Sequence, residues 1–412
     1  MVERTVLDSG LVIISEYIPT FPSFDLSYTI RGGSRNETLE NNGIYHMIEH
    51  MLFKGTKKYN LRDIADISDR LGGKLDAYTG KETTHFRIKA VDEYLELSFD
   101  LLTDMMKNSI FPPDEFEKEK NVILQEIHEA DDSPDENAFE TFYERVFGRN
   151  GLAYPVGGKI ESVSAFKRDA VFEFYKKVYT PDNMLLATIG KAPHEQIVAM
   201  AQQAFSDYPS KKPANFVFDS PQIQHSSFSK QNNSLNQVYV IIGFDGLSMT
   251  APLRHRYMIL NDILGAGMSS RLFQRIREEK GLSYTISSFN DAYQDCGLHV
   301  VYSTVEPMKV NEYQTAVNDE IARLKSDGIT EEELKRAKDS IKSSIILGFE
   351  SRMTKLRFNV NNELFIKKNL SLEEIITNIN ETTVDDINRL FNEHLDLDHM
   401  SVFLYGDLRK RK

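Results

Sequence analysis

The feature that most constrains this chain is the segment 43–53, which contains the pattern His46-x-x-Glu49-His50. Because the two histidines are four residues apart, an α-helix would place both imidazoles on one face, one turn from each other. That spacing allows two neutral imidazoles to bind one tetrahedral Zn²⁺ at about 2.0–2.1 Å. Glu49 would project within about 100° of both, where it can act on a water without being a ligand. The segment therefore predicts a helix suited to zinc-dependent hydrolysis.

A histidine on an apolar helix is more often a satisfied core residue than a metal ligand. The metal interpretation therefore needs the third protein ligand that a catalytic zinc site has. The best source of a third ligand is the predicted helical segment 116–129, in which Glu119 and Glu126 lie beside an apolar stripe. On a helical wheel the two lie within about 20° of each other, and carboxylates next to a buried face need partners. The wheel does not decide which of the two binds. An ordinary charged helix without a metal is the alternative.

Length and composition limit the classes of protein that fit. A chain of 412 residues suggests two domains of about 200 residues each. The net charge of −13 argues against nucleic acid as a partner, since phosphate binding needs a basic surface. Cys296 is the only cysteine, which excludes an intrachain disulfide and suits a reducing compartment. The sequence shows neither a signal peptide nor an apolar run long enough for a membrane span, so we expect a cytoplasmic protein without a membrane partner.

The apolar periodicity predicts two halves of mixed structure. We expect a catalytic domain over 1–209, a linker over 210–220 and a second domain over 221–412, because the segment 208–213 is polar with two prolines. Period-two alternation predicts strands, and period-3.6 patterns predict helices. The expected strands are 24–30, 86–90 and 238–242, and the expected helices are 62–71, 93–106, 115–130, 256–264, 272–279 and 330–349.

The two halves share part of their pattern. The apolar stripe of the first long helix recurs 218 residues later, where Phe116, Ile123, Ile127 and Ala130 are matched by Leu334, Ile341, Ile345 and Gly348. In the second half, Ala266, Ser269 and Ser270 stand where the first half has His46, Glu49 and His50. We therefore expect two similarly folded halves, of which only the first binds a metal.

Several motifs together resemble a known family. His46-x-x-Glu49-His50 is followed 76 residues after His50 by Glu126. Further matches are Met51 to Thr56, Gly72-Gly73 with Asp76 to Thr79, Glu82, the pair Glu119 and Glu126, Met268 to Phe273, and Arg277 to Tyr284. This set is similar to the pitrilysin and mitochondrial-processing-peptidase family of zinc metallopeptidases, the inverzincins. In length and organisation the chain looks most like the small bacterial processing proteases.

The resemblance implies both a fold and a metal site. The fold is α+β, with two similarly folded halves, each a mostly antiparallel sheet packed by helices, forming a clamshell around a chamber. His46, His50 and Glu126 would bind one zinc ion per chain, with Glu49 as the general base. Glu119 would be a carboxylate that supports the metal ligands from behind.

The resemblance also implies how substrate is held. Segment 73–79 would be an edge strand to which an extended peptide adds by backbone hydrogen bonds, and its residues Gly73, Asp76, Ala77 and Thr79 would contact substrate, with Phe53 shaping an apolar pocket. Arg277 and Tyr284 would bind substrate and stabilise the oxyanion. Without the resemblance, Arg277 reads as a surface cation and Tyr284 as a core aromatic.

Two positions depart from the family's pattern. Asp76 stands where Asn is usual, and Phe86 where Tyr is frequent. An additional acid beside the substrate strand would favour basic residues in the peptide.

These expectations amount to a zinc metalloendopeptidase acting on peptides or unfolded segments, with a site completed when the halves close. A homodimer is expected from the family. The alternative is a non-catalytic partner or scaffold subunit, a class that has lost the zinc motif in this family, whereas this chain keeps every metal position. Metal binding without proteolysis has no feature in its favour.

Overall fold

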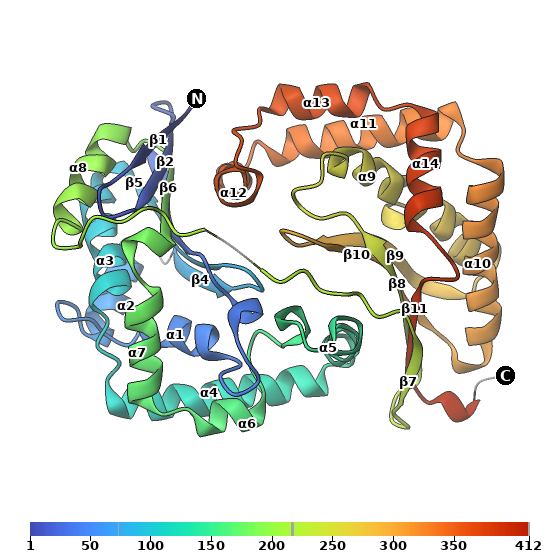
Figure 1. Ribbon diagram of the computed structural model, residues 1–412, viewed down its shortest axis with the longest axis horizontal. Helices are drawn as coiled ribbons and strands as arrows, with labels where there is room; N and C mark the ends of the chain where they lie inside the picture. The colour runs from blue at the N-terminus through green and yellow to red at the C-terminus, as the bar shows by residue number, and fades with distance from the viewer. Residues whose placement is uncertain (73, 216–217, 411–412) are drawn as a thin grey trace. The chain divides into compact units, whose positions relative to one another are not determined.

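The structure is a computed structural model that describes residues 1–72, 74–215 and 218–410 (Figure 1). The chain divides into two compact units. One comprises Met1–Asp132, Arg149–Phe218 and Phe349–Leu364, and the other comprises Ser133–Gly148, Asp219–Gly348 and Phe365–Lys412. Unlike the continuous domains expected over 1–209 and 221–412, each unit contains a helix from the opposite half of the sequence.

The first unit is built on a mostly antiparallel sheet with strand order β1-β2-β6-β3-β5-β4. Its strands are β1 (Val2–Val6), β2 (Val12–Tyr17), β3 (Ser23–Ile30), β4 (Leu75–Thr79), β5 (Thr84–Val91) and β6 (Met184–Gly190). The alternation that predicted β3 places Phe24, Leu26 and Tyr28 in the core, where all three are fully buried. Strand β4 stands at the edge of the sheet, as predicted.

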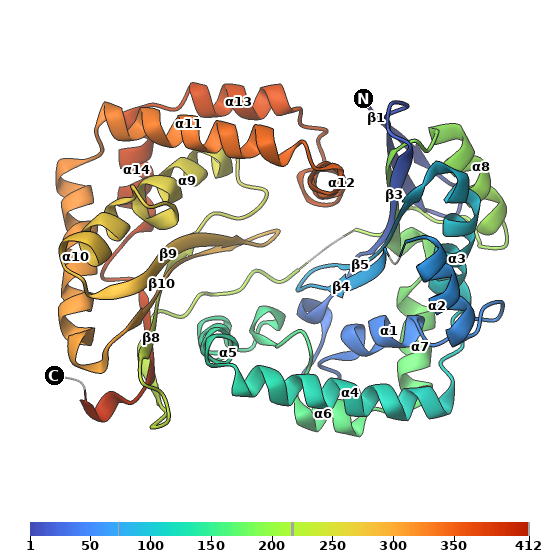
Figure 2. The same ribbon diagram turned by 180° about the vertical axis from the view of Figure 1, so that it is seen from behind.

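Helices cover both faces of this sheet. They are α1 (Ile44–Leu52), α2 (Leu61–Arg70), α3 (Leu95–Asn108), α4 (Pro113–Asp132), α6 (Ile160–Ala165), α7 (Arg168–Val178), α8 (His194–Ala204) and α12 (Arg352–Asn361). Helices α3 and α8 pack on one face and α12 on the opposite face (Figures 1 and 2). The alternation of β3 explains the two faces, because Phe24 points to the core whereas Asp25 forms an ion pair with Arg352 of α12 at 3.0 Å.

The second unit repeats this topology. Its sheet has the order β7-β11-β8-β10-β9, with strands β7 (Ser227–Gln231), β8 (Val238–Gly246), β9 (Ser283–Ala292), β10 (Gly297–Val305) and β11 (Ser401–Gly406). In the first unit the last strand, β6, lies between β2 and β3 and runs parallel to β2, and in the second unit the last strand, β11, lies between β7 and β8 and runs parallel to β7. Apart from the additional β1, the strand orders correspond one to one. This correspondence confirms the prediction of two similarly folded halves.

The second unit has its own set of helices. They are α5 (Pro134–Phe147), α9 (Arg254–Asn261), α10 (Val310–Asp327), α11 (Glu331–Gly348), α13 (Leu372–Asn380) and α14 (Val384–His394). A capping box forms at the start of α11, where the backbone N–H of Glu333 donates to the Thr330 hydroxyl and the Glu333 carboxylate accepts from the Thr330 N–H. The helix expected over 272–279 is instead a π-helical segment, Phe273–Glu279.

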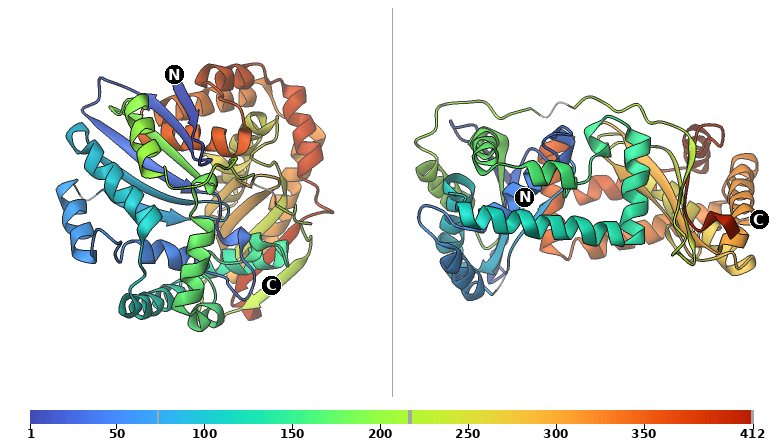
Figure 3. Two further views of the ribbon diagram at one scale, coloured as in Figure 1. Left: turned by 60° about the vertical axis from the view of Figure 1, so that its left-hand side comes forward. Right: turned by 90° about the horizontal axis from the view of Figure 1, so that it is seen from below.

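The long helices α4 and α11 are equivalent elements, as the repeated stripe predicted. Phe116, Ile123, Leu334 and Ile341 are all buried. Each long helix is followed by a helix that belongs to the other unit: α4 by α5, and α11 by α12. The full length of α4, beside α6, can be followed in Figure 3. Among the described residues, no helix is long and apolar enough to cross a membrane.

Candidate metal centre

Helix α1 is fixed at its start by a buried carboxylate. Gly43 precedes the helix with φ 92°, a conformation that favours glycine. The Glu37 carboxylate accepts hydrogen bonds from the backbone N–H groups of Gly43 at 2.8 Å and Tyr45 at 3.0 Å, which caps the helix. Burial raises the pKa of Glu37 to about 7, although these hydrogen bonds oppose the shift. Glu37 lies six residues before Gly43, outside the short spacing of an ordinary capping box, so no local pattern in the sequence marks it as a cap.

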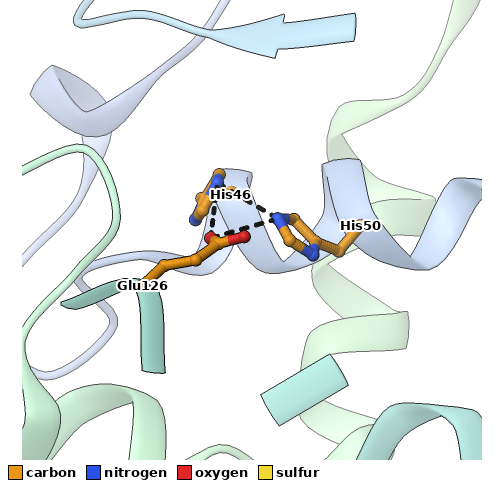
Figure 4. A group of neighbouring side chains, drawn as sticks. All are labelled: His46, His50 and Glu126. Carbon is orange, nitrogen blue, oxygen red and sulfur yellow. Dashed lines mark hydrogen bonds and ion pairs between the residues drawn. The ribbon is translucent and has the colours of Figure 1, made fainter. Parts of the chain in front are cut away.

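Three side chains of α1 and α4 converge on one point (Figure 4). His46 Nε2 and His50 Nε2 are 3.2 Å apart, and Glu126 Oε2 lies 3.8 Å from the first and 3.6 Å from the second. Among the described residues, this is the only group of three or more His, Cys, Asp or Glu side chains whose ligand atoms are close enough to hold a metal ion. The structure thus brings together the three residues proposed as ligands.

The geometry and the protonation of this group fit a zinc ion. Tetrahedral ligand atoms at about 2.1 Å from an ion are about 3.4 Å apart, and the observed separations of 3.2, 3.6 and 3.8 Å lie around that value. Burial, followed by the nearby charge of His50, lowers the pKa of His46 to about 4. His46 is therefore neutral near physiological pH, with its Nε2 in the group. Two histidines and a carboxylate form a donor set typical of zinc hydrolases.

Glu119 occupies a different place from Glu126, although the wheel puts both on the same side of α4. Its Oε2 lies 2.9 Å from His50 Nδ1, and its Oε1 lies 2.7 Å from Lys54 Nζ. Burial alone would raise the pKa of Glu119, but hydrogen bonds from His50 and Lys54 outweigh it and hold the pKa below its usual value. An ionised Glu119 makes His50 Nδ1 a donor and leaves the Nε2 lone pair free for a metal.

Glu49 lies in the same helix as the two histidines but outside the group of three. Its Oε2 accepts a hydrogen bond of 2.5 Å from the Thr79 hydroxyl at the end of β4. Burial raises the pKa of Glu49, and the charges of Asp76 and Glu126 add to this, whereas Thr79 and His50 oppose it. A buried carboxylate with a raised pKa is a better proton acceptor than a solvated one.

The predicted substrate residues that the structure describes cluster around β4. Ala77 is partly buried against the core, as is Phe53, whose ring centroid lies 6.4 Å from that of Phe86. The carboxylate of Asp76 forms an ion pair of 2.7 Å with Arg87 on the neighbouring strand. The extra negative charge noted in the sequence is therefore largely balanced. Gly73 lies outside the described residues.

Arg277 and Tyr284 belong to the second unit and contact each other there. The Arg277 side chain donates a hydrogen bond of 3.1 Å to the backbone carbonyl of Tyr284. Its guanidinium also lies 4.4 Å from the centroid of the Tyr284 ring. Tyr284 is 76% exposed, so the interpretation as a core aromatic is wrong. The role of this pair toward substrate stays a prediction.

Comparison with known proteins agrees with the resemblance drawn from the motifs. The profile described as insulinase (peptidase family M16) matches residues 12–159, and that described as the peptidase M16 inactive domain matches 165–341. An uncharacterised zinc protease of Bacillus subtilis is 34% identical over 95% of both chains, and one of Rickettsia felis is 34% identical over 94% of both.

Two solved structures are similar in fold. A protease from Helicobacter pylori has a TM-score of 0.89 at 21% identity, covering 98% of this chain and 99% of its own. A peptidase M16 inactive domain from Pseudomonas fluorescens has a TM-score of 0.91 at 22% identity, covering 100% of this chain and 99% of its own.

Proposed function

Because the chain belongs to the insulinase family of peptidases, family M16, we propose that it is a zinc-dependent endopeptidase acting on peptides or unfolded segments. The observation that carries this proposal is the convergence of His46, His50 and Glu126 on one point with separations suited to a zinc ion. The relatives are named as zinc proteases, and these names support the same metal. We propose one zinc ion per chain.

A zinc ion bound there would supply Lewis acidity to a water and to a peptide carbonyl. The residues of the chain supply the proton transfers. Glu49, partly buried beside the ligand group, accepts a proton from the attacking water and later delivers it to the leaving amine. Glu119 holds His50 in the tautomer that presents Nε2 to the ligand group.

The edge strand β4 is the element that we propose to bind the peptide backbone. It pairs with β5 on one side and is the last strand in the order of the sheet. An extended peptide can add to such an edge through main-chain hydrogen bonds. Since Thr79 ends β4 and contacts Glu49, a peptide on this edge would pass next to the general base. This arrangement favours extended or unfolded substrates over folded ones.

We propose that Arg277 and Tyr284 bind substrate and stabilise the oxyanion. The guanidinium is a charged donor suited to a peptide carbonyl or a developing oxyanion. Tyr284 exposes most of its side chain, so its phenol is free to contact a substrate.

The experiment that tests the proposal compares the wild-type protein with Glu49→Gln on a peptide library read by mass spectrometry, with and without a chelator. We expect the variant to bind zinc with the wild-type stoichiometry and to lose at least about 100-fold in turnover. A fully active Glu49→Gln protein would contradict the proposed role of Glu49. Cleavage that persists with zinc completely removed would contradict the zinc mechanism.

The alternative is a non-catalytic partner subunit. The complete ligand group argues against it. A purified chain that binds no zinc and cleaves no peptide after zinc is added would favour the alternative. We further propose that the protein is a homodimer and is cytoplasmic, on the family resemblance and the composition. A monodisperse species of monomer mass in light scattering would contradict the dimer.

A further inference from the structure

The hydroxyl of Thr79 makes a specific contact with the carboxylate of Glu49. Thr79 is the last residue of β4, and Glu49 lies in the middle of α1, so the contact joins two elements that are 30 residues apart in sequence. The Thr79 Oγ1 to Glu49 Oε2 distance is 2.5 Å, and both side chains are partly buried. Among the described residues, no other hydrogen bond to the Glu49 carboxylate is found.

This contact decides how Glu49 is oriented. A glutamate side chain has several rotatable bonds, and a carboxylate held by one directional donor loses most of that freedom. The hydroxyl occupies Oε2, which leaves Oε1 to accept a proton. A general base must lie within about 2.6–3.2 Å of the proton that it removes, so fixing its rotamer bears directly on turnover.

We infer that Thr79 is a positioning residue for the general base, rather than only a residue that contacts substrate. The inference rests on the proposed function of Glu49. Strand β4 then serves two tasks, because it both offers its edge to a peptide and holds the base. A peptide that orders β4 would therefore order Glu49 in the same event.

The test uses Thr79→Val, which removes the hydroxyl and keeps the branched shape, and Thr79→Ser, which restores the hydroxyl. The neighbouring Thr83→Val is a matched control, since the Thr83 hydroxyl lies 2.8 Å from His85 Nε2 and does not contact Glu49. We expect Thr79→Val to lower kcat about 10- to 100-fold with KM within about twofold. Thr79→Ser should retain kcat within about threefold, and all variants should bind zinc and melt like the wild type.

Several outcomes would overturn the inference. One is an unchanged kcat in Thr79→Val. A second is a rise in KM at constant kcat, which would make Thr79 a substrate contact only. A third is an equal loss in Thr79→Ser and Thr79→Val, which would point to packing. If the wild type itself cleaves no peptide, the proposed function fails, and crystal structures of the zinc-loaded proteins still test the contact. The Glu49 carboxylate should then turn away from its wild-type rotamer in Thr79→Val alone, and an unmoved carboxylate would overturn the inference.

Discussion

Lys54 places its ammonium 2.7 Å from the carboxylate of Glu119, whose other oxygen lies 2.9 Å from His50 Nδ1. The cation is therefore linked to the proposed metal centre through Glu119 and His50. Both Lys54 and Glu119 are largely buried, at 20% and 10% exposure, so the ion pair is only weakly screened.

We predict that Lys54→Met weakens zinc binding about tenfold, because loss of a supporting partner behind a metal ligand costs about 10–100-fold in affinity. Lys54→Arg should lose less, since it keeps the charge. Zinc affinity is measured by competition with a chromophoric chelator. Lys58→Met is the control, because Lys58 pairs with the exposed Asp100 away from the ligand group. An affinity equal to wild type in Lys54→Met would contradict this account.

The two carboxylates of α4 should differ in their effect on zinc. Glu126→Gln removes the charge of a proposed ligand, whereas Glu119→Gln removes only the contact with His50 Nδ1. We expect Glu126→Gln to weaken zinc binding by more than about 100-fold and Glu119→Gln by about 10–100-fold. Calorimetric titration of the apo-protein with zinc at fixed pH measures both. The reverse order would exchange the roles of the two residues.

The exchanged helix α12 should be essential to the stability of the first unit. Arg352 and Asp25 form a buried pair with side-chain exposures of 11% and 2%, and Arg352 also donates to the Ser23 hydroxyl at 2.7 Å. We expect Arg352→Met to lower the free energy of unfolding by about 3–5 kcal/mol, because it leaves Asp25 buried without its cation. The double variant Asp25→Asn/Arg352→Met should recover part of this loss. Denaturant unfolding measures both, and a loss below about 0.5 kcal/mol in Arg352→Met would be inconsistent with the prediction.

His299 should make the second unit sensitive to acid. Its side chain is fully buried in β10, and neither ring nitrogen has a hydrogen-bond partner within the described part of the chain. Burial, with a smaller contribution from His394, lowers the pKa of His299 to about 3. Unfolded histidine titrates near about 6.5, so between these values the unfolded chain binds more protons and stability falls as pH falls.

We therefore predict that His299→Phe stabilises the protein by about 1–3 kcal/mol at neutral pH, since it removes two unpaired buried nitrogens. The phenyl ring can keep the edge contact with Tyr257, whose centroid lies 5.6 Å from the imidazole. The gain over wild type should increase as pH falls below about 6.5. Thermal unfolding at several pH values measures it. A gain that is constant with pH would refute the assigned titration.

The pairing of Asp76 with Arg87 should limit the effect of Asp76 on cleavage preference. Because the two side chains form an ion pair at 2.7 Å, Asp76→Asn should shift the preference for basic over neutral peptides by less than about threefold. Arg87→Met, which leaves Asp76 unpaired, should increase that preference. Library digestion compares the variants. A large shift in Asp76→Asn together with none in Arg87→Met would show that Asp76 acts as a free charge.

The local patterns of the sequence were sufficient to predict the helix that carries the two histidines and the central strand of the first sheet. Residues four apart, such as His46 and His50, lie on one face of any α-helix, and the alternation from Phe24 to Ile30 is typical of any half-buried strand. Both elements form where predicted. The capping box at Thr330 and Glu333 likewise depends only on residues within one turn. The π-helical segment Phe273–Glu279 was missed because periodicity does not distinguish it from an α-helix.

What the sequence by itself determined is thus the pair of histidines on one helix face, the glutamate between them that we propose as the general base, and the presence of two carboxylates on a second helix. The tertiary structure decided which carboxylate faces which nitrogen. Glu119 and Glu126 are seven residues apart, or about 10.5 Å along the helix axis, so only the placement of α4 beside α1 sets their partners. Lys54 and Thr79 acquire their roles in the same way. The exchange of α5 and α12 between units also has no local signal, because an amphipathic helix does not encode which sheet it covers.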